Sequence, residues 1–351
     1  HGGKGICLGP KNYLGRGYES IPISITVEGA NILTRSMIVF GQGAVRCHPF
    51  ALMELDAANQ ADPGQALKQF DKAIWGHIGF TISNFARSLT HAVTGGRLLP
   101  TPAIICRRYF QLFGRFSASF ALLADMSMLA IGGDLKRREM ISARLGDILS
   151  YLYLGSTVLK RFDEQGRIYA DLPLVEWCCD YLLYQIQQQI DGLLRNYPKR
   201  ILAWVLRFCI FPFGRHFAYP ADELHKDLAM MLQTPTATRD RLIEGAYLTD
   251  DGIHPVGRLE TLLQNVKALE PLLQLIEQAR KDKKIHGRSM RAQIEEALTL
   301  GLINNEEAVA LLRFDQDVAD IIAVDDFAPQ DLARTVTLVD SEGNMVKALI
   351  E

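Results

Sequence analysis

The chain has 351 residues, 48% of them hydrophobic and 22% charged, with a formal net charge of −2. This length and composition allow one large hydrophobic core or two smaller ones and exclude a disordered chain. Lys and Arg are spread along the sequence, which argues against a nucleic-acid-binding protein, because such proteins concentrate basic charge on one surface. The six cysteines form no CxxC pair, so we expect free thiols in a reducing, cytoplasmic compartment and no metal centre.

The first 30 residues are rich in Gly, Pro and Ser. They open on a glycine turn and lack the basic head and apolar stretch of a signal peptide, so we expect the chain to be part of a longer protein. Alternating Ile, Ser and Thr over residues 21–27 predict a short strand or a fixed loop. From Asn31 onward the hydrophobic period becomes that of helices.

Helical periodicity is clear in two central segments. Over residues 118–131 the apolar side chains recur every three or four positions, and Gly132-Gly133 is expected to stop the helix. Over residues 176–195 an apolar face is predicted to lie opposite a polar side formed by residues 187–189. That apolar face consists of Leu182, Ile186, Ile190 and Leu193.

The C-terminal part shows the same period. The apolar stripe over residues 256–283 predicts a helix that Pro271 breaks in two. Gly301 is expected to end a later helix, and Asn304 or Asn305 to cap the next one. The sequence therefore predicts a mainly α protein built of helical bundles, with a short extended or loop segment at the N-terminus.

Two stretches with turn-forming residues mark candidate domain boundaries. Residues 94–101 are expected to separate a first helical domain, 1–95, from a helical C-terminal extension, 96–351. A further boundary is expected inside this extension, near residues 247–255.

Common catalytic motifs are missing from the sequence. The Gly-Gln-Gly of residues 41–43 lacks the third glycine of a dinucleotide fingerprint, so helix packing through small residues is the better interpretation. His48 precedes a proline at an expected helix boundary and His77 lies on a helical stretch, and both are interpreted as structural histidines. Asp125 has apolar neighbours on both sides and is expected to make a buried polar contact, although nothing nearby in the sequence provides a partner.

The longest apolar run, residues 201–214, is too short to span a bilayer, which takes about 20 apolar residues. It is either a buried helix or a helix lying in a membrane surface, because aromatic and basic side chains occur together in it. These side chains are Trp204, Phe208, Phe211 and Phe213 with Arg200, Arg207 and Arg215. A separate basic pair, Arg107-Arg108, is expected to lie on a solvated face.

Residues 26–35 differ from the rest of the chain, with the sequence Thr-Val-Glu-Gly-Ala-Asn-Ile-Leu-Thr-Arg. A single carboxylate, Glu28, closes the extended stretch, and a helix is expected to begin directly after Gly29. This glycine leaves room for a ligand near the backbone, and the first amides of a helix can meet a phosphate or a polarised carbonyl oxygen. From the spacing alone, Glu28 is either a base facing a cleft or a charge at a helix N-terminus.

This segment resembles the acyl-CoA dehydrogenase signature, in which Glu-Gly-Thr/Ala-Asn follows an aromatic or aliphatic residue. Residues 1–5 resemble the Gly-Gly-x-Gly turn of the same family, and 25 residues separate Gly3 from Glu28, as in the family pattern. Residues 3–10 and 23–49 look closer still to one subgroup, the long bacterial enzymes of fatty-acid oxidation, which carry a large helical C-terminal extension. The specific match covers residues 1–50.

The resemblance implies a flavin enzyme that converts fatty acyl-CoA to trans-2-enoyl-CoA in fatty-acid β-oxidation. Glu28 would abstract the α-proton while the β-hydride passes to the flavin, and Gly29 would lie against the substrate. FAD would be contacted by Ala30, Asn31, Ile32 and, in a neighbouring subunit, by Gly3. Since Ala30 stands where many relatives have Thr, a hydroxyl contact to the flavin is lost there or supplied elsewhere.

The family fold implies an N-terminal helical domain, a β-domain and a C-terminal helical bundle, with FAD held between them and across a dimer. We therefore expect a fatty acyl-CoA substrate, an electron-transfer acceptor and a homo-oligomer, and we expect this chain alone to be inactive. The alternative is a helical module for oligomerisation or membrane association, in which Glu28 has no catalytic role.

Overall fold

The computed structural model describes residues 2–7, 9, 12–26, 33–102, 104–250, 254–324, 327, 335–339 and 345–349. The described residues are mainly helical, as the sequence predicts, and the chain divides into two compact units. The larger unit comprises Ser24–Met230, and the smaller unit combines His1–Ile23 with Met231–Glu351.

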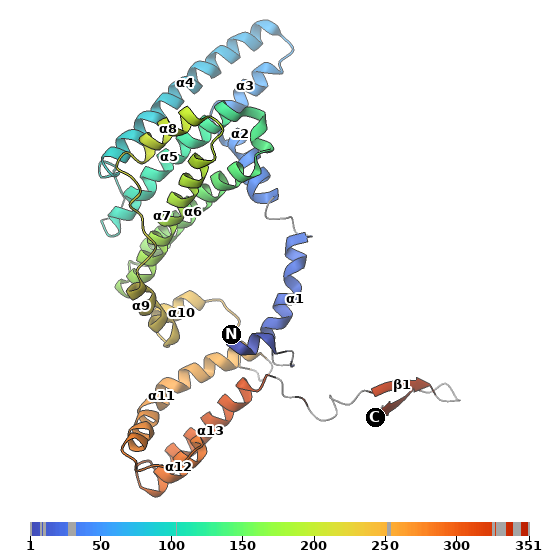
Figure 1. Ribbon diagram of the computed structural model, residues 1–351, viewed down its shortest axis with the longest axis vertical. Coiled ribbons are helices and arrows are strands. Elements are labelled where there is room, and N and C mark those ends of the chain that lie inside the picture. The colour runs from blue at the N-terminus through green and yellow to red at the C-terminus, as the bar shows by residue number, and fades with distance from the viewer. Residues whose placement is uncertain are drawn as a thin grey trace. The chain divides into compact units, whose positions relative to one another are not determined.

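In the larger unit, short helical segments precede a bundle of long helices (Figure 1). The short segments are the π-helix η2 (Leu33–Gln42), α2 (Gly43–Cys47) and α3 (Ala51–Ala58). They are followed by α4 (Pro63–Val93), α5 (Arg107–Ile131), η3 (Gly132–Lys136), α6 (Glu139–Glu164), η4 (Tyr169–Asp171), α7 (Leu172–Arg195), α8 (Arg200–Ile210) and α9 (Asp222–Gln233). Helix α5 packs against α4, α6 and α7, and α8 packs against α4 and α7, so the helices enclose one core.

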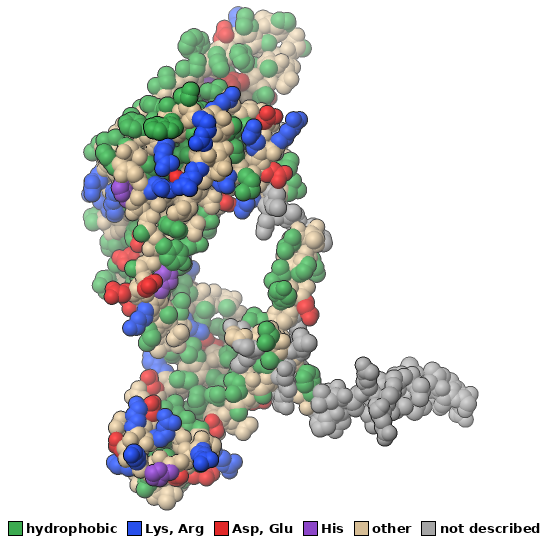
Figure 2. All heavy atoms as spheres, in the orientation of Figure 1, with side chains coloured by type: hydrophobic (Ala, Val, Ile, Leu, Met, Phe, Trp, Pro, Cys, Tyr) green, Lys and Arg blue, Asp and Glu red, His purple; other side chains and the backbone are tan. Residues whose placement is uncertain are grey.

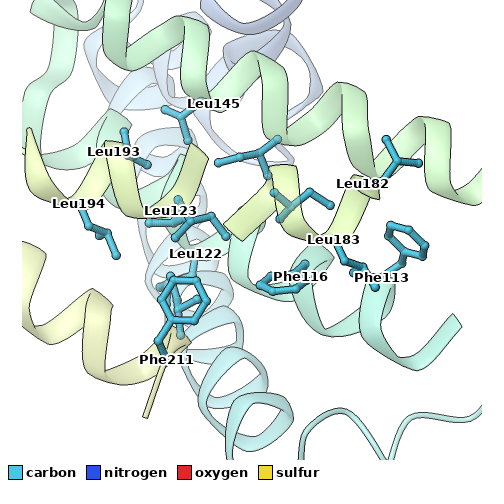
Figure 3. Packing of buried hydrophobic residues seen from close by; sticks show 14 of the residues in the cluster. Phe113, Phe116, Leu122, Leu123, Leu145, Leu182, Leu183, Leu193, Leu194 and Phe211 are labelled. Atoms are coloured by element: carbon cyan, nitrogen blue, oxygen red, sulfur yellow. The ribbon is translucent and has the colours of Figure 1, made fainter. Parts of the chain in front are cut away.

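This core is a continuous apolar cluster, supplied mainly by α5, α6, α7 and α8 (Figure 3). On α5, Phe116, Leu122 and Leu123 are at most 1% exposed. They belong to the same cluster as Leu145 of α6 and Leu183 of α7. Burying a side chain of this size contributes about 1.5–3 kcal/mol, so apolar packing is the main source of stability in this unit.

The two central helices largely follow their predicted boundaries and faces. Helix α5 ends at Ile131, and Gly132 takes a positive φ of 59°, which favours glycine. The predicted apolar face of α7 is buried, but Gln187, which was predicted on the polar side, is buried as well. Its amide nitrogen donates to the Phe217 carbonyl at 2.8 Å, and its oxygen accepts the Phe217 N–H at 3.1 Å. The backbone that returns after α8 thus satisfies the buried glutamine.

The smaller unit contains three packed helices and a hairpin among its described elements. Its elements are η1 (Gly2–Ile6), most of α1 (Tyr13–Thr26), α10 (Ala237–Ile243), α11 (Pro255–Lys281), α12 (Met290–Thr299), α13 (Asn305–Ile322), β1 (Thr335–Val339) and β2 (Met345–Leu349). Helices α11, α12 and α13 share a small apolar core that includes Ile276, Ile294 and Leu311. Strands β1 and β2 pair antiparallel, with Thr335 opposite Leu349.

The predicted helix ends in this unit are confirmed. Gly301 follows α12 with a φ of +70°. The Asn304 side chain accepts the Glu307 N–H at 2.9 Å, and the Glu307 carboxylate accepts the Asn304 N–H at 2.8 Å. This reciprocal capping box fixes the start of α13.

The predicted break at Pro271 is wrong, because α11 runs without interruption from Pro255 to Lys281. A proline inside a helix removes the hydrogen bond to the carbonyl four residues earlier, here that of Lys267. Both residues are exposed, so water can solvate that carbonyl and the helix continues.

The prediction of an extended stretch over residues 21–27 is wrong for residues 21–26, which form the last part of α1. The overlooked signal is Asn12, whose side-chain oxygen accepts the Gly15 N–H at 2.9 Å and caps the helix. Val27 lies outside the described residues.

Residues 94–101 lie in the connection between α4 and α5, and Gly95 and Gly96 have positive φ angles there. The two helices that flank this connection pack on each other inside the larger unit. The domain boundary at 95/96 and the further one near 247–255 stay predictions.

One described stretch, Arg107–Leu135, has the length and hydropathy of a membrane-spanning helix. It includes α5, which buries both Arg115 and Asp125 together with its apolar residues. Buried residues all along α5 identify it as a core helix of the bundle.

Candidate functional site

The predicted base and most of its neighbours, Glu28, Gly29, Ala30, Asn31 and Ile32, lie outside the described residues. Of the predicted FAD contacts Gly3 is described, and it lies in η1. The roles of all six residues stay predictions.

The π-helix η2 begins at Leu33, directly after this segment, and it is anchored on the bundle. Phe40 is 2% exposed and packs against Phe120 of α5, with ring centroids 6.3 Å apart. Arg35 Nη1 lies 3.4 Å from Asp147 Oδ1 on α6. Gly146 allows the close approach, because a Cβ there would lie 3.0 Å from the Arg35 carbonyl oxygen. The chain that follows the signature is therefore fixed to α5 and α6.

A group of polar side chains lies where α3, α4 and α5 meet, and we call it the His77 cluster: His48, Glu54, His77, Thr81 and Asp125. His77 stands between two carboxylates, with Nδ1 2.7 Å from Glu54 Oε1 and Nε2 2.8 Å from Asp125 Oδ1. Thr81 donates its hydroxyl to Asp125 Oδ2 at 2.5 Å. The Asp125 side chain is 2% exposed, so its charge needs these partners.

The His77 ring carries a proton on both nitrogens in this arrangement, because each nitrogen faces a carboxylate oxygen. Burial would lower the pKa of His77, but the hydrogen bonds to Asp125 and Glu54 outweigh burial, and the pKa is raised above its ordinary value. His77 is thus a cation shared by two partly buried anions.

His48 is held in the opposite protonation state. Its Nδ1 accepts the backbone N–H groups of Phe50 at 3.2 Å and Ala51 at 3.0 Å, at the start of α3. Hydrogen bonding therefore assigns the ring proton to Nε2, and the ring is neutral. Burial and the neighbouring His77 lower the pKa of His48. Nε2 is buried without a hydrogen-bond partner in the described part of the chain and lies 3.6 Å from Asp125 Oδ1.

The spacing within this cluster raises the question of a metal ion, since His48 Nε2, His77 Nε2 and a carboxylate oxygen of Asp125 lie within 4.8 Å of one another. A ligand nitrogen must offer a lone pair to the metal. Coordination through His48 Nε2 would place the ring proton on Nδ1, against two backbone N–H donors. The geometry therefore favours a network that holds a proton over a divalent-cation site.

The sequence analysis placed His48, His77 and Asp125 on the correct elements without bringing them together, and it did not single out Glu54 or Thr81. His48 follows α2 and His77 lies on α4, as predicted. Asp125 makes the buried polar contact that was predicted, but its partners Thr81 and His77 are 44 and 48 residues away along the chain. The available signal was a carboxylate amid apolar residues on a helix, which requires a distant partner.

Comparison with known proteins identifies the family. Residues 45–327 match the family described as acyl-CoA dehydrogenase, C-terminal, bacterial type. This region extends from α2 through α13 and includes the whole His77 cluster. No solved structure matches the chain. Because the family match covers most of the chain, the protein belongs to the bacterial-type acyl-CoA dehydrogenase C-terminal family, which confirms the resemblance and indicates a dehydrogenase-type function.

Proposed function

We propose that the protein is part of a FAD-dependent enzyme that oxidises fatty acyl-CoA to trans-2-enoyl-CoA in cytoplasmic β-oxidation. The family match over residues 45–327 carries this proposal, and the Glu-Gly-Ala-Asn motif of residues 28–31 adds support. Its partners are a fatty acyl-CoA, an electron-transfer acceptor and further copies of the chain.

In this proposal Glu28 removes the α-proton of the acyl thioester. That proton is weakly acidic, so the negative charge that develops on the thioester oxygen needs hydrogen-bond donors, among them the Glu28 backbone N–H. FAD, when bound, accepts the β-hydride. Gly29 would lie against the substrate, which its missing side chain permits.

The residues proposed to hold FAD are Ala30, Asn31 and Ile32, with Gly3 of a neighbouring subunit. Gly3 is the described member of this set, and it follows Gly2, whose φ is +62°. A Cβ added at Gly2 would meet no atom within 4 Å in the described part of the chain.

The proposal is tested by turnover of the full-length enzyme. Incubated with a fatty acyl-CoA and an electron-accepting dye, it should reduce the dye and yield trans-2-enoyl-CoA, identified by mass spectrometry. If FAD is bound and neither product forms, the proposed reaction is excluded.

The 351-residue chain by itself is expected to be colourless and inactive. In the family, FAD is held between three domains and across a dimer, so a chain dominated by the C-terminal region should lack most of the flavin pocket. The measurement is the flavin absorption band and acyl-CoA-dependent dye reduction of the purified chain, with the full-length enzyme as the control. A flavin band in the chain alone would contradict this expectation.

A second candidate function is docking on a membrane surface, and α8 gives specific support for it. Ile201, Trp204 and Phe208 share one side of α8 and are 86%, 77% and 64% exposed. Residues 192–221 contain five Lys or Arg and no Asp or Glu. Asp191, just before this stretch, pairs with Arg195, Arg207 and Arg215, and Lys199 and Arg200 lie at the start of α8. Exposed aromatic side chains beside basic ones are typical of helices that lie in the headgroup region of a bilayer.

Replacing both Trp204 and Phe208 by Ser is expected to weaken co-sedimentation with anionic vesicles by about tenfold or more, because the aromatic anchors are lost. The matched control replaces Tyr153 and Tyr169 by Ser, since these are 68% and 86% exposed and lie outside α8. This control should bind vesicles as the unchanged chain does. No binding by the unchanged chain would exclude membrane docking.

A further inference from the structure

A pocket with basic walls lies in the larger unit, where the end of α4, the first part of α5 and the segment after α8 meet. Its volume is about 370 Å³. Three arginines line it, Arg97, Arg108 and Arg115, together with His216, and we call it the arginine pocket. Figure 2 shows Lys and Arg side chains among hydrophobic ones over the region where Figure 1 draws α5 and α8.

Two of the arginines are held in place by backbone carbonyls. Arg108 Nη1 donates to the Gly95 carbonyl at 2.7 Å, and Arg115 Nη2 donates to the Ile210 carbonyl at 2.9 Å. Arg115 is 7% exposed, and its Nε is buried without a hydrogen-bond partner in the described part of the chain. The carbonyl groups fix these side chains, and the Arg115 guanidinium also lies 5.3 Å from the centroid of the Phe116 ring, a cation–π contact.

The pocket lacks a counter-ion of its own. Among the described residues that line it there is no Asp or Glu. Residues 72–124, which include the end of α4 and most of α5, contain no acidic residue, and neither do residues 192–221. The three arginines therefore line the pocket without a carboxylate among its described lining residues.

Burial and like-charged neighbours lower the pKa values of two of these arginines. Burial and the neighbouring Arg97 lower the pKa of Arg108. Burial and the neighbouring Arg108 lower the pKa of Arg115 to about 10. Clustered like charges in a partly desolvated site cost free energy, and a bound anion would remove that cost.

We propose that the arginine pocket binds a phosphate group. The planar fork of a guanidinium matches two phosphate oxygens, and hydrogen bonds between charged partners are the strong ones. Arg115 lines the pocket and is buried, so it would supply its positive charge at the inner wall, while Arg97 and Arg108 are exposed and would close over the outer oxygens.

The phosphate could belong to a phospholipid headgroup or to a soluble phosphate compound, and both present the same oxygens. Phe213 lines the pocket and is 66% exposed. Because Phe213 lines the pocket, an apolar side chain lies beside the proposed phosphate site. This arrangement suits a lipid headgroup whose acyl chains lie against apolar side chains.

Titration of the full chain with inorganic phosphate and pyrophosphate tests the proposal, at constant ionic strength and followed by calorimetry and phosphorus NMR. The unchanged chain should bind saturably, and Arg108→Gln and Arg97→Gln should each weaken binding by about tenfold or more. Arg107→Gln is the matched control, because Arg107 is the exposed neighbour of Arg108 and does not line the pocket. Arg115→Lys tests the inner wall, with circular dichroism confirming that the variant is folded. Non-saturable binding, or equal weakening by Arg107→Gln and Arg108→Gln, would overturn the proposal.

Vesicles of phosphatidylcholine with and without phosphatidylglycerol distinguish the two sources of phosphate. If a headgroup occupies the pocket, Arg108→Gln weakens binding to phosphatidylglycerol vesicles, Arg107→Gln does not, and inorganic phosphate competes. If a soluble phosphate is the ligand, Arg108→Gln weakens phosphate binding and leaves vesicle binding unchanged. Neither the phosphate titration nor the vesicle-binding assay measures turnover. A negative result in the phosphate titration would therefore overturn phosphate binding without bearing on the proposed dehydrogenase reaction.

Discussion

In the full-length enzyme, Glu28→Gln is expected to abolish acyl-CoA dehydrogenation while FAD remains bound. Glutamine keeps the shape of glutamate but cannot accept the α-proton, so the loss falls on the chemical step. A general base contributes about 10²–10⁴-fold to a reaction rate, and turnover should fall at least that far. Substrate should still bind, because the backbone at Gly29 is unchanged.

Dye reduction measures turnover, and the flavin absorption spectrum shows whether FAD remains bound. Glu19→Gln is the matched control, since Glu19 is exposed on α1 and undergoes the same chemical change. It should leave turnover unchanged. If Glu28→Gln turned over normally with FAD bound, Glu28 would not be the base, and the helical association module would be the better account of the chain.

The helices could be predicted from the sequence because their signals are local. The end of α5 at Gly132 and the start of α13 at Asn304 each depend on residues within one turn of the helix. The wrong prediction over residues 21–26 missed a local signal, the Asn12 cap. The other two wrong predictions have a different cause. Gln187 is buried because Phe217 supplies its partners, and Pro271 is tolerated because Lys267 is solvated. Neither circumstance can be recognised within the helix itself.

The polar sites were less predictable, since they exist only after the helices pack. Asp125 alone indicated a buried contact, but its partner His77 comes from another helix. Arg108 was predicted to be a solvated residue; it is exposed, yet packing places Arg97 and Arg115 beside it. The role of Glu28 as the base was predicted from resemblance to a family motif, and it does not depend on how the helices pack.

His77→Ala is expected to destabilise the larger unit by about 3–5 kcal/mol, the usual cost of removing one partner from a buried ion pair. Without the imidazolium, the Asp125 carboxylate is buried with the Thr81 hydroxyl as its remaining hydrogen-bond donor in the cluster. The free energy of unfolding from denaturant titrations at pH 6 measures the loss. His91→Ala is the matched control on the same helix, because His91 has no carboxylate partner among the described residues and burial lowers its pKa. It should cost about 1 kcal/mol, the ordinary value for a point substitution.

The dependence of this loss on pH tests the charge of His77 directly. Two carboxylates raise the pKa of His77 in the folded state. The contribution of His77 to stability is therefore fully present at pH values below 6.5, the pKa of histidine in the unfolded chain. It is lost as the pH rises through the raised pKa that His77 has in the folded chain. The lowered pKa of His48 acts in the opposite direction, and burial, its largest cause, is present in both the unchanged chain and His77→Gln, so that part cancels in the comparison. The stability difference between the two should shrink from about pH 6 to pH 9. A constant difference over this range would mean that His77 does not carry the proposed charge.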